Sequence, residues 1–170
     1  MLGCAVGCSG GDHPTMPAAG GIRPSSPSPD PRTVAAIDAA LAAYSGYLAA
    51  TTEAEQSADP HHPELPKYLA DPLLTRVGLA IRDAKEHGAM RTGTLISDPR
   101  VTAVSLDTVP ATVSIQDCLD TTNYRLVYVK DRSVVPGSTS GRYIATATAT
   151  RYADGRWLIS AGNAHRDQPC

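Results

Sequence analysis

The spacing of hydrophobic positions divides the chain into a first part with helical period and a second part with strand period. From residue 34 to residue 48, apolar side chains recur every three or four residues, which places them on one face of a helix. Asp30 followed by Pro31 is typical of a helix start, with Asp30 as the N-cap. We therefore predict a long first helix that begins at Pro31 and ends in the polar run 53–57. Its apolar face consists of Val34, Ile37, Leu41, Tyr44 and Leu48.

A proline-rich stretch separates this helix from a second long one. Residues 59–66 contain three prolines and predict a loop, followed by at most a short turn over 67–69. The pair Asp71-Pro72 predicts the start of the second long helix, and Gly88 after His87 predicts its end. The buried stripe of this helix is expected to contain Leu73, Leu74, Val77 and Ile81.

Beyond about residue 95 the apolar period changes to two, which predicts strands. Asp154-Gly155 is typical of a hairpin turn, and the Ala/Thr alternation within 141–152 predicts a curved strand with small residues on one face. Helices followed by an antiparallel meander predict an α+β domain in which the helices pack on one face of a bent sheet. The expected strands are 101–106, 111–118, 124–130, 141–152 and 156–161.

The first 30 residues resemble the export and tether region of a lipoprotein. Ala5-Val6-Gly7-Cys8 resembles the sequence around a lipid-modified cysteine, and Cys4 is a weaker second candidate. No Lys or Arg precedes Cys8, so we interpret 1–8 as a truncated signal and lipobox remnant; the alternative is a chance match in a tail rich in small residues. The Pro/Ser/Gly-rich segment 9–30 predicts a disordered tether, and 31–170 the folded domain.

Composition and charge exclude several classes of function. The net charge of −2 provides no global field for nucleic acid, and no run of 18 apolar residues predicts a membrane span. With no Phe and one Trp, the core must be built from Val, Ile, Leu, Ala and Tyr. The polar residues of the proline-rich loop lack the spacing of a zinc site, so we expect a solvated loop and neither metal nor cofactor. These loop residues are Asp59, His61, His62 and Glu64.

Three segments carry a resemblance to a known family. Residues 68–74 (YLADPLL), 111–120 (ATVSIQDCLD) and 151–160 (RYADGRWLIS), in this order of elements, resemble the NTF2-like (SnoaL-like) domains of small secreted or lipid-anchored actinobacterial proteins. The resemblance implies a cone in which N-terminal helices pack on a curved antiparallel sheet of four to six strands. It covers nearly all of residues 32–170, and its motifs are structural.

The same resemblance implies a possible site inside the cone, because the fold also hosts isomerases, hydratases and hydrolases. Such a site needs a carboxylate or histidine base in an apolar pocket and a tyrosine or acid donor opposite. The alternative is that the tyrosines fill the core and the aspartates lie in solvent. The candidate pocket residues are Tyr44, Tyr68, Asp107, Asp117, Tyr128 and Tyr143.

The two cysteines of the folded part are expected to form a disulfide. Cys118 lies at a predicted strand end and Cys170 is the last residue printed. In an oxidising compartment this pair would connect the C-terminal residues to the sheet; in the cytosol both would be free thiols.

Taken together, the sequence predicts an exported envelope protein, anchored in the membrane through a lipid on Cys8 or else secreted. We expect a non-catalytic binding or accessory domain whose partner is a protein, a lipid or a cell-wall polymer, with no nucleic acid bound. Arg142, Tyr143, Arg151 and Tyr152 could form its exposed basic and aromatic surface. The alternatives are an isomerase or hydratase acting in the cone, and an envelope lipoprotein of a phage or mobile element that excludes competitors.

Overall fold

The computed structural model describes residues 30–170, and helix α1 (Pro31–Gln56) is its longest element. The helix begins as predicted: Asp30 Oδ1 accepts a hydrogen bond from the Arg32 amide at 3.1 Å, and Pro31 occupies the first turn. At the other end, the Ser57 hydroxyl donates to the Glu53 carbonyl at 2.7 Å. The predictions made for the signal remnant 1–8, for the tether up to residue 29 and for Cys8 fall outside the described residues.

Two further helices follow the proline-rich loop. The one-turn helix α2 (Leu65–Tyr68) includes the expected short turn, and α3 (Leu73–Glu86) is the predicted second long helix. The chain leaves α3 through Gly88, whose φ of +66° is left-handed and therefore suits glycine. The start and the end of α3 both lie where the sequence predicts them.

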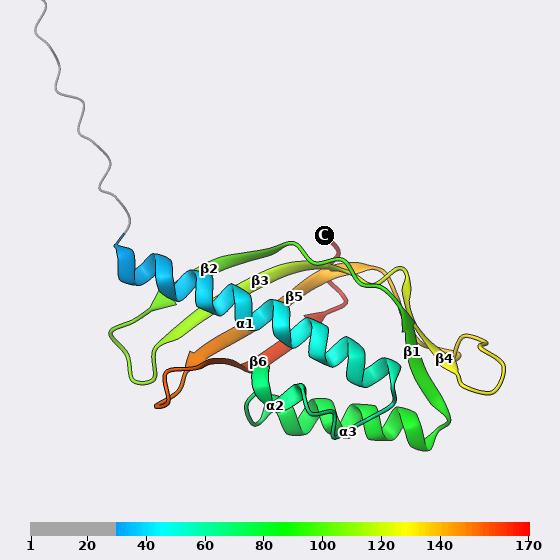
Figure 1. Cartoon of the computed structure of the whole chain (residues 1–170). Coiled ribbons are helices and arrows are strands. Elements are labelled where there is room, and N and C mark those ends of the chain that lie inside the picture. The colour runs from blue at the N-terminus through cyan, green and yellow to red at the C-terminus, as the bar shows by residue number, and fades with distance from the viewer. Residues whose placement is uncertain (1–29) are drawn as a thin grey trace, which may run out of the picture.

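The larger sheet contains four antiparallel strands in the order β2-β3-β5-β6. These strands are β2 (Pro99–Ser105), β3 (Thr112–Asp120), β5 (Arg142–Arg151) and β6 (Trp157–His165). The predicted turn between β5 and β6 is present, and Gly155 has a φ of +85° in it. Figure 1 shows the curvature of these strands beneath α1.

A second, two-stranded sheet departs from the predicted meander. The strand β4 (Tyr124–Tyr128) does not lie between β3 and β5, which pair directly with each other; it pairs instead with β1 (Ala89–Gly93). The sequence did not predict β1, because Ala-Met-Arg-Thr-Gly is short and lacks an apolar alternation. This small sheet extends beyond the end of the larger one (Figure 1).

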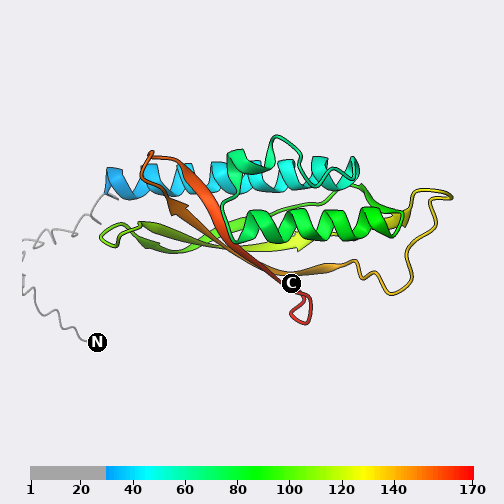
Figure 2. The ribbon, with the colours of Figure 1, turned by 90° about the horizontal axis from the view of Figure 1, so that it is seen from below.

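The helices pack on one face of the curved sheet, as Figure 2 shows from below. The buried cluster between them is rich in alanine, because both α1 and β5 contribute small side chains. Small residues allow the helix to approach the sheet closely. On β5 the alanines are buried and the intervening threonines at 146 and 148 are half-buried, as the alternation predicts. The alanines of this main cluster are Ala36, Ala40, Ala43, Ala50 and Ala54 on α1 and Ala147 and Ala149 on β5, and Ala145 of β5 is buried in a second, smaller cluster.

This arrangement confirms the predicted fold class: an α+β domain with N-terminal helices packed on a curved antiparallel sheet. The expectation that no segment is apolar enough to span a membrane needs correction, because α1 is long and apolar enough by length and composition. Its packing explains the apolar composition, since α1 supplies buried residues to the domain core.

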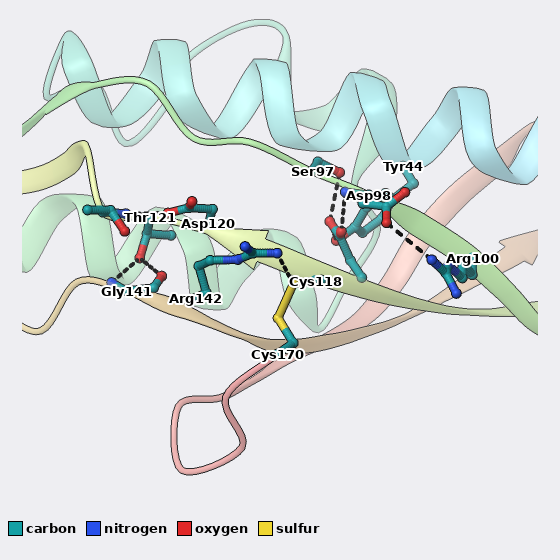
Figure 3. The surroundings of a disulfide bond; sticks show 12 residues. Tyr44, Ser97, Asp98, Arg100, Cys118, Asp120, Thr121, Gly141, Arg142 and Cys170 are labelled. Atoms are coloured by element: carbon teal, nitrogen blue, oxygen red, sulfur yellow. Dashed lines mark hydrogen bonds and ion pairs between the residues drawn. A yellow bond between two sulfur atoms is a disulfide. The ribbon is translucent and has the colours of Figure 1, made fainter.

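The predicted disulfide is present between Cys118 on β3 and Cys170. Their Cα atoms lie 5.8 Å apart, and the bond connects residues 52 positions apart in sequence. Figure 3 shows the bridge on the sheet, with the guanidinium of Arg142 directed at Cys118 Sγ from 3.4 Å. The bond therefore attaches the C-terminal residues to a central strand.

Candidate functional site

A cavity of about 340 Å³ lies between the two long helices and the sheet. One face of α1 forms the first wall of the cavity. The lining residues of this helix recur every three or four positions, which places them on the same face. The facing stripe of α3 forms the second wall. The α1 wall contains Tyr44, Tyr47, Leu48, Thr51, Thr52 and Glu55, and the α3 wall contains Leu73, Arg76, Val77 and Ala80.

Strands and the segments that join them close the cavity on the remaining sides. Tyr143 and Ala145 of β5 and Gly162 of β6 contribute to this surface, with Leu119 at the end of β3 and Leu95 from the connection after β1. Most of the lining is apolar or aromatic. A concave, mostly apolar cavity with a few polar groups is typical of a small-molecule site.

A half-buried carboxylate, Glu55, lies at one end of the cavity, with one oxygen hydrogen-bonded and the other in an ion pair. The Tyr124 hydroxyl donates to Glu55 Oε2 at 2.6 Å, and Arg91 Nε lies 3.5 Å from Oε1. The side chains of Glu55 and Arg91 are only 23% and 22% exposed. Burial raises the pKa of Glu55, which Arg91 and Tyr124 partly oppose. Burial and the nearby Glu55 carboxylate raise the pKa of Tyr124 well above its ordinary value.

A second carboxylate, Asp117, is buried behind the cavity wall and accepts three hydrogen bonds. Its residue is 1% exposed. Tyr44 Oη donates to Asp117 Oδ2 at 2.9 Å, Ser97 Oγ donates to the same oxygen at 2.7 Å, and the Asp98 amide donates to Oδ1 at 2.7 Å. Burial and then Asp117 raise the pKa of Tyr44 well above its ordinary value. Figure 3 shows Tyr44, Ser97 and Asp98 converging from α1 and the segment before β2.

The two carboxylates therefore act as acceptors that hold the cavity together. A general base must present a free oxygen to the substrate within hydrogen-bond reach. Glu55 is engaged by Tyr124 and Arg91, and Asp117 is engaged by three donors away from the cavity lining.

Two arginines stand at the exposed side of the cavity. Arg76 on α3 donates from its guanidinium to the Gly162 carbonyl on β6. The guanidinium of Arg166, just after β6, lies 5.6 Å from the centre of the Tyr143 ring. Neither arginine forms an ion pair within residues 30–170. The two arginines thus place positive charge at the cavity entrance, and this charge forms no ion pair within residues 30–170.

Two hydroxyl groups on the α1 wall, those of Thr51 and Tyr47, add to the polar lining. Thr51 Oγ1 is buried and has no hydrogen-bond partner within the described residues. Burial, with a smaller contribution from Glu55, raises the pKa of Tyr47 to about 12. Both groups therefore stay protonated at neutral pH and can donate a hydrogen bond to a ligand.

The structure brings together only part of the predicted pocket. Tyr44 and Tyr143 line the cavity, and Asp117 binds Tyr44 behind its wall. The expectation of a solvated Asp117 was wrong, because β3 continues to Asp120 and keeps Asp117 inside the sheet. Three of the predicted residues lie elsewhere. Tyr68 packs against Gly46, Asp107 is 101% exposed in the turn after β2, and Tyr128 lines a neighbouring groove.

Sequence reasoning missed the polar residues of the cavity. Glu55 continues the helical series from Tyr44 through Leu48 and Thr51, so that spacing could have indicated it. Other polar residues come from segments whose proximity no local pattern shows. Among them are Arg76, Arg91, Tyr124 and Arg166.

A neighbouring groove of about 390 Å³ continues from the cavity between α3 and the small sheet. Glu55, Ala80 and Arg91 line both, so the Glu55–Arg91 pair lies where the two spaces meet. The groove also contains Tyr128 and His87. Within residues 30–170, no group of three His, Cys, Asp or Glu side chains is arranged to hold a metal ion.

The predicted exposed surface on β5 is only partly present. Arg142 and Arg151 are exposed and Tyr152 is 37% exposed. Tyr143 is buried and faces the cavity, on the opposite side of the strand from Arg142, because side chains alternate along a strand. The aromatic part of the expected surface therefore belongs to the cavity.

Comparisons with known proteins show neither a family nor a function. No family model matches the chain, and no curated protein matches it. Among solved structures, the chain is similar to the intermembrane space region of the chloroplast protein ARC6, with 17% identity and a TM-score of 0.48. The match covers 85% of this chain and all of that one. The disulfide is a feature typical of an exported protein.

Proposed function

We propose that this protein is an exported, lipid-anchored envelope protein that binds a small, largely apolar molecule in the cavity and does not transform it. The observation that carries the proposal is a cavity whose two nearby carboxylates are both held by neighbouring protein groups, Glu55 by Tyr124 and Arg91 and Asp117 by three donors. The lining offers apolar area and hydrogen-bond donors, and these groups bind a ligand without supplying an acid–base pair.

The proposed location follows from the sequence and agrees with the disulfide. Cys8 would carry the lipid, and the tether 9–30 would separate the domain from the membrane. A random coil of this length spans roughly 25 Å. A disulfide between Cys118 and Cys170 is favoured in an oxidising compartment outside the cytoplasm.

The enzyme alternative has weaker support, because an isomerase or hydratase of this kind needs a carboxylate free to take a proton. Freeing Glu55 would require breaking its contacts with Tyr124 and Arg91. The alternative of a competitor-excluding lipoprotein stays a prediction, which the neighbouring genes would test.

Ligand binding is tested by titrating the full chain with N-phenyl-1-naphthylamine, a neutral apolar dye that fluoresces on leaving water. We expect saturable binding of one dye per chain. Ala80→Trp should abolish this binding, because Ala80 lines the cavity where it meets the neighbouring groove and a tryptophan there would occupy the space of the dye. Ala42→Trp is the matched control on an exposed position of α1 that does not line the cavity. Absence of saturable binding, or equal loss in both variants, would contradict the proposal.

The anchor is tested separately by expressing the chain behind a complete signal and determining the mature N-terminus by mass spectrometry. We expect a lipid-modified Cys8 in the membrane fraction and release into the soluble fraction for Cys8→Ser. An unmodified Cys8 in soluble protein would exclude the anchor and leave the binding proposal untouched.

A further inference from the structure

We propose that the cavity takes an anionic amphiphile: a molecule with one carboxylate or phosphate head and one apolar body. Arg76 and Arg166 would bind the head at the entrance, and the apolar lining would hold the body. This inference rests on the proposed binding function and adds the chemical class of the ligand.

The cavity lining has more positively than negatively charged side chains. It contains three arginines and one acid, Glu55. Glu55 lies 3.5 Å from Arg91, so this pair is balanced when both groups are charged. Arg76 and Arg166 form no ion pair within residues 30–170, although Arg166 is near enough to help lower the pKa of Glu55, and an arginine stays charged at any ordinary pH. The entrance is therefore electrostatically complementary to an anion.

Both arginines are held in positions from which they can bind an anion. Arg76 comes from α3, and its hydrogen bond to the Gly162 carbonyl holds the guanidinium against β6. Arg166 follows β6 and rests against the Tyr143 ring, which lines the cavity. A guanidinium has five N–H donors, so each arginine keeps donors free for an oxyanion. Both groups are exposed, so an anion can reach them from solvent.

The rest of the cavity lining is largely apolar. Behind the arginines lie the apolar parts of Leu48, Val77 and Tyr143. Thr51 Oγ1, buried and unpartnered within the described residues, offers a further hydrogen bond in the same lining. A purely polar anion would leave this apolar surface uncovered, and a neutral apolar molecule would leave the arginines without an acceptor. An anionic head on an apolar body satisfies both.

A matched pair of dyes separates this inference from the proposed function. 1-Anilinonaphthalene-8-sulfonate has the same aromatic body as N-phenyl-1-naphthylamine and adds one negative charge. With the full chain, we expect the anionic dye to bind more tightly than the neutral dye, and its advantage to shrink as salt screens the arginines. Binding of the neutral dye with no preference for the anionic one would overturn the inference and leave the proposed function standing.

Variants test which residues produce the preference. Arg76→Gln and Arg166→Gln should each lower the ratio of anionic to neutral dye affinity by about 3- to 5-fold, the effect expected of an exposed ion pair. Arg76→Lys keeps the charge and should keep most of the ratio. Arg82→Gln, on an exposed position of α3 outside the cavity, is the control and should leave the ratio unchanged.

Competition with single-chain amphiphiles identifies the head group. We expect dodecanoate or dodecyl phosphate to displace the anionic dye better than dodecanol, and the order of these two anions distinguishes a carboxylate from a phosphate ligand. Equal displacement by dodecanol, by the dodecyltrimethylammonium cation and by both anions would overturn the inference, because it would show that the entrance does not recognise charge.

Discussion

Tyr44, in the middle of α1, donates a hydrogen bond to the buried carboxylate of Asp117 on β3 at 2.9 Å, across 73 residues of sequence. The same tyrosine lines the cavity. This contact joins the longest helix to a central strand and fixes part of the cavity wall. The binding site therefore depends in part on this polar contact within the core.

Tyr44→Phe should therefore destabilise the domain. The substitution removes one of three donors to a carboxylate that is shielded from water, and losing such a bond typically costs about 1–3 kcal/mol. The free energy of unfolding in urea measures the loss. Tyr152→Phe, at a partly exposed tyrosine, is the control and should change stability by less than about 0.5 kcal/mol. Equal stability of both variants would contradict this role of Tyr44.

Reducing the disulfide should lower stability more than any single polar substitution. The bond connects residues 52 positions apart, and the chain-entropy model gives about 4 kcal/mol for a loop of this size. Urea unfolding with and without reductant measures the difference. The variant with both Cys118→Ser and Cys170→Ser should resemble the reduced protein and show no response to reductant. Unfolding curves of the native protein that coincide under both conditions would contradict the prediction.

The stability contributed by Glu55 should decrease as pH rises. Burial raises the pKa of this carboxyl above its ordinary value of 4.5, so the folded state binds the proton more tightly than the unfolded state. This tighter proton binding makes its full contribution to stability below pH 4.5. The contribution is lost as pH rises through the raised pKa of the folded state. Stability of the native protein minus that of Glu55→Gln should therefore fall over this range. A difference that rises with pH would show that Arg91 and Tyr124 outweigh burial.

Gly46→Ala should destabilise the contact between α1 and α2, although alanine favours helix formation. An added Cβ at this position would overlap the ring of Tyr68, and overpacking of this kind typically costs about 1–3 kcal/mol. Combining the change with Tyr68→Ala should recover part of the cost, so the two losses should not add. Ser45→Ala, on the adjacent exposed position, is the control and should leave the urea midpoint unchanged or raise it. Additive losses would contradict the predicted overlap.

Local patterns were sufficient to predict the helices, the strands other than β1, and the fold class. Asp30-Pro31 and Gly88 set helix ends through contacts within a few residues, and the β5 alternation reflects burial on one face. The pairing of β4 with β1 was not predicted, because five residues without alternation carry no strand signal and their partner is more than 30 residues away. The disulfide was predictable from compartment and cysteine count.

The site was less predictable than the fold. Tyr44 and Tyr143 were identified because aromatic side chains on a core-facing helix and strand tend to lie inward. Asp107 was placed in the candidate pocket although it lies in an exposed turn. The Glu55–Arg91–Tyr124 cluster joins α1 to the small sheet, so its prediction required the strand pairing that the sequence did not reveal.

The position of a bound ligand tests the central claim most directly. We propose methyl NMR of the full chain during titration with N-phenyl-1-naphthylamine. The account predicts saturable shifts confined to the cavity methyls of Leu48, Val77 and Leu95, with no change at the exposed Leu79 and Val129. Shifts at the exposed methyls with none at the cavity methyls would contradict it.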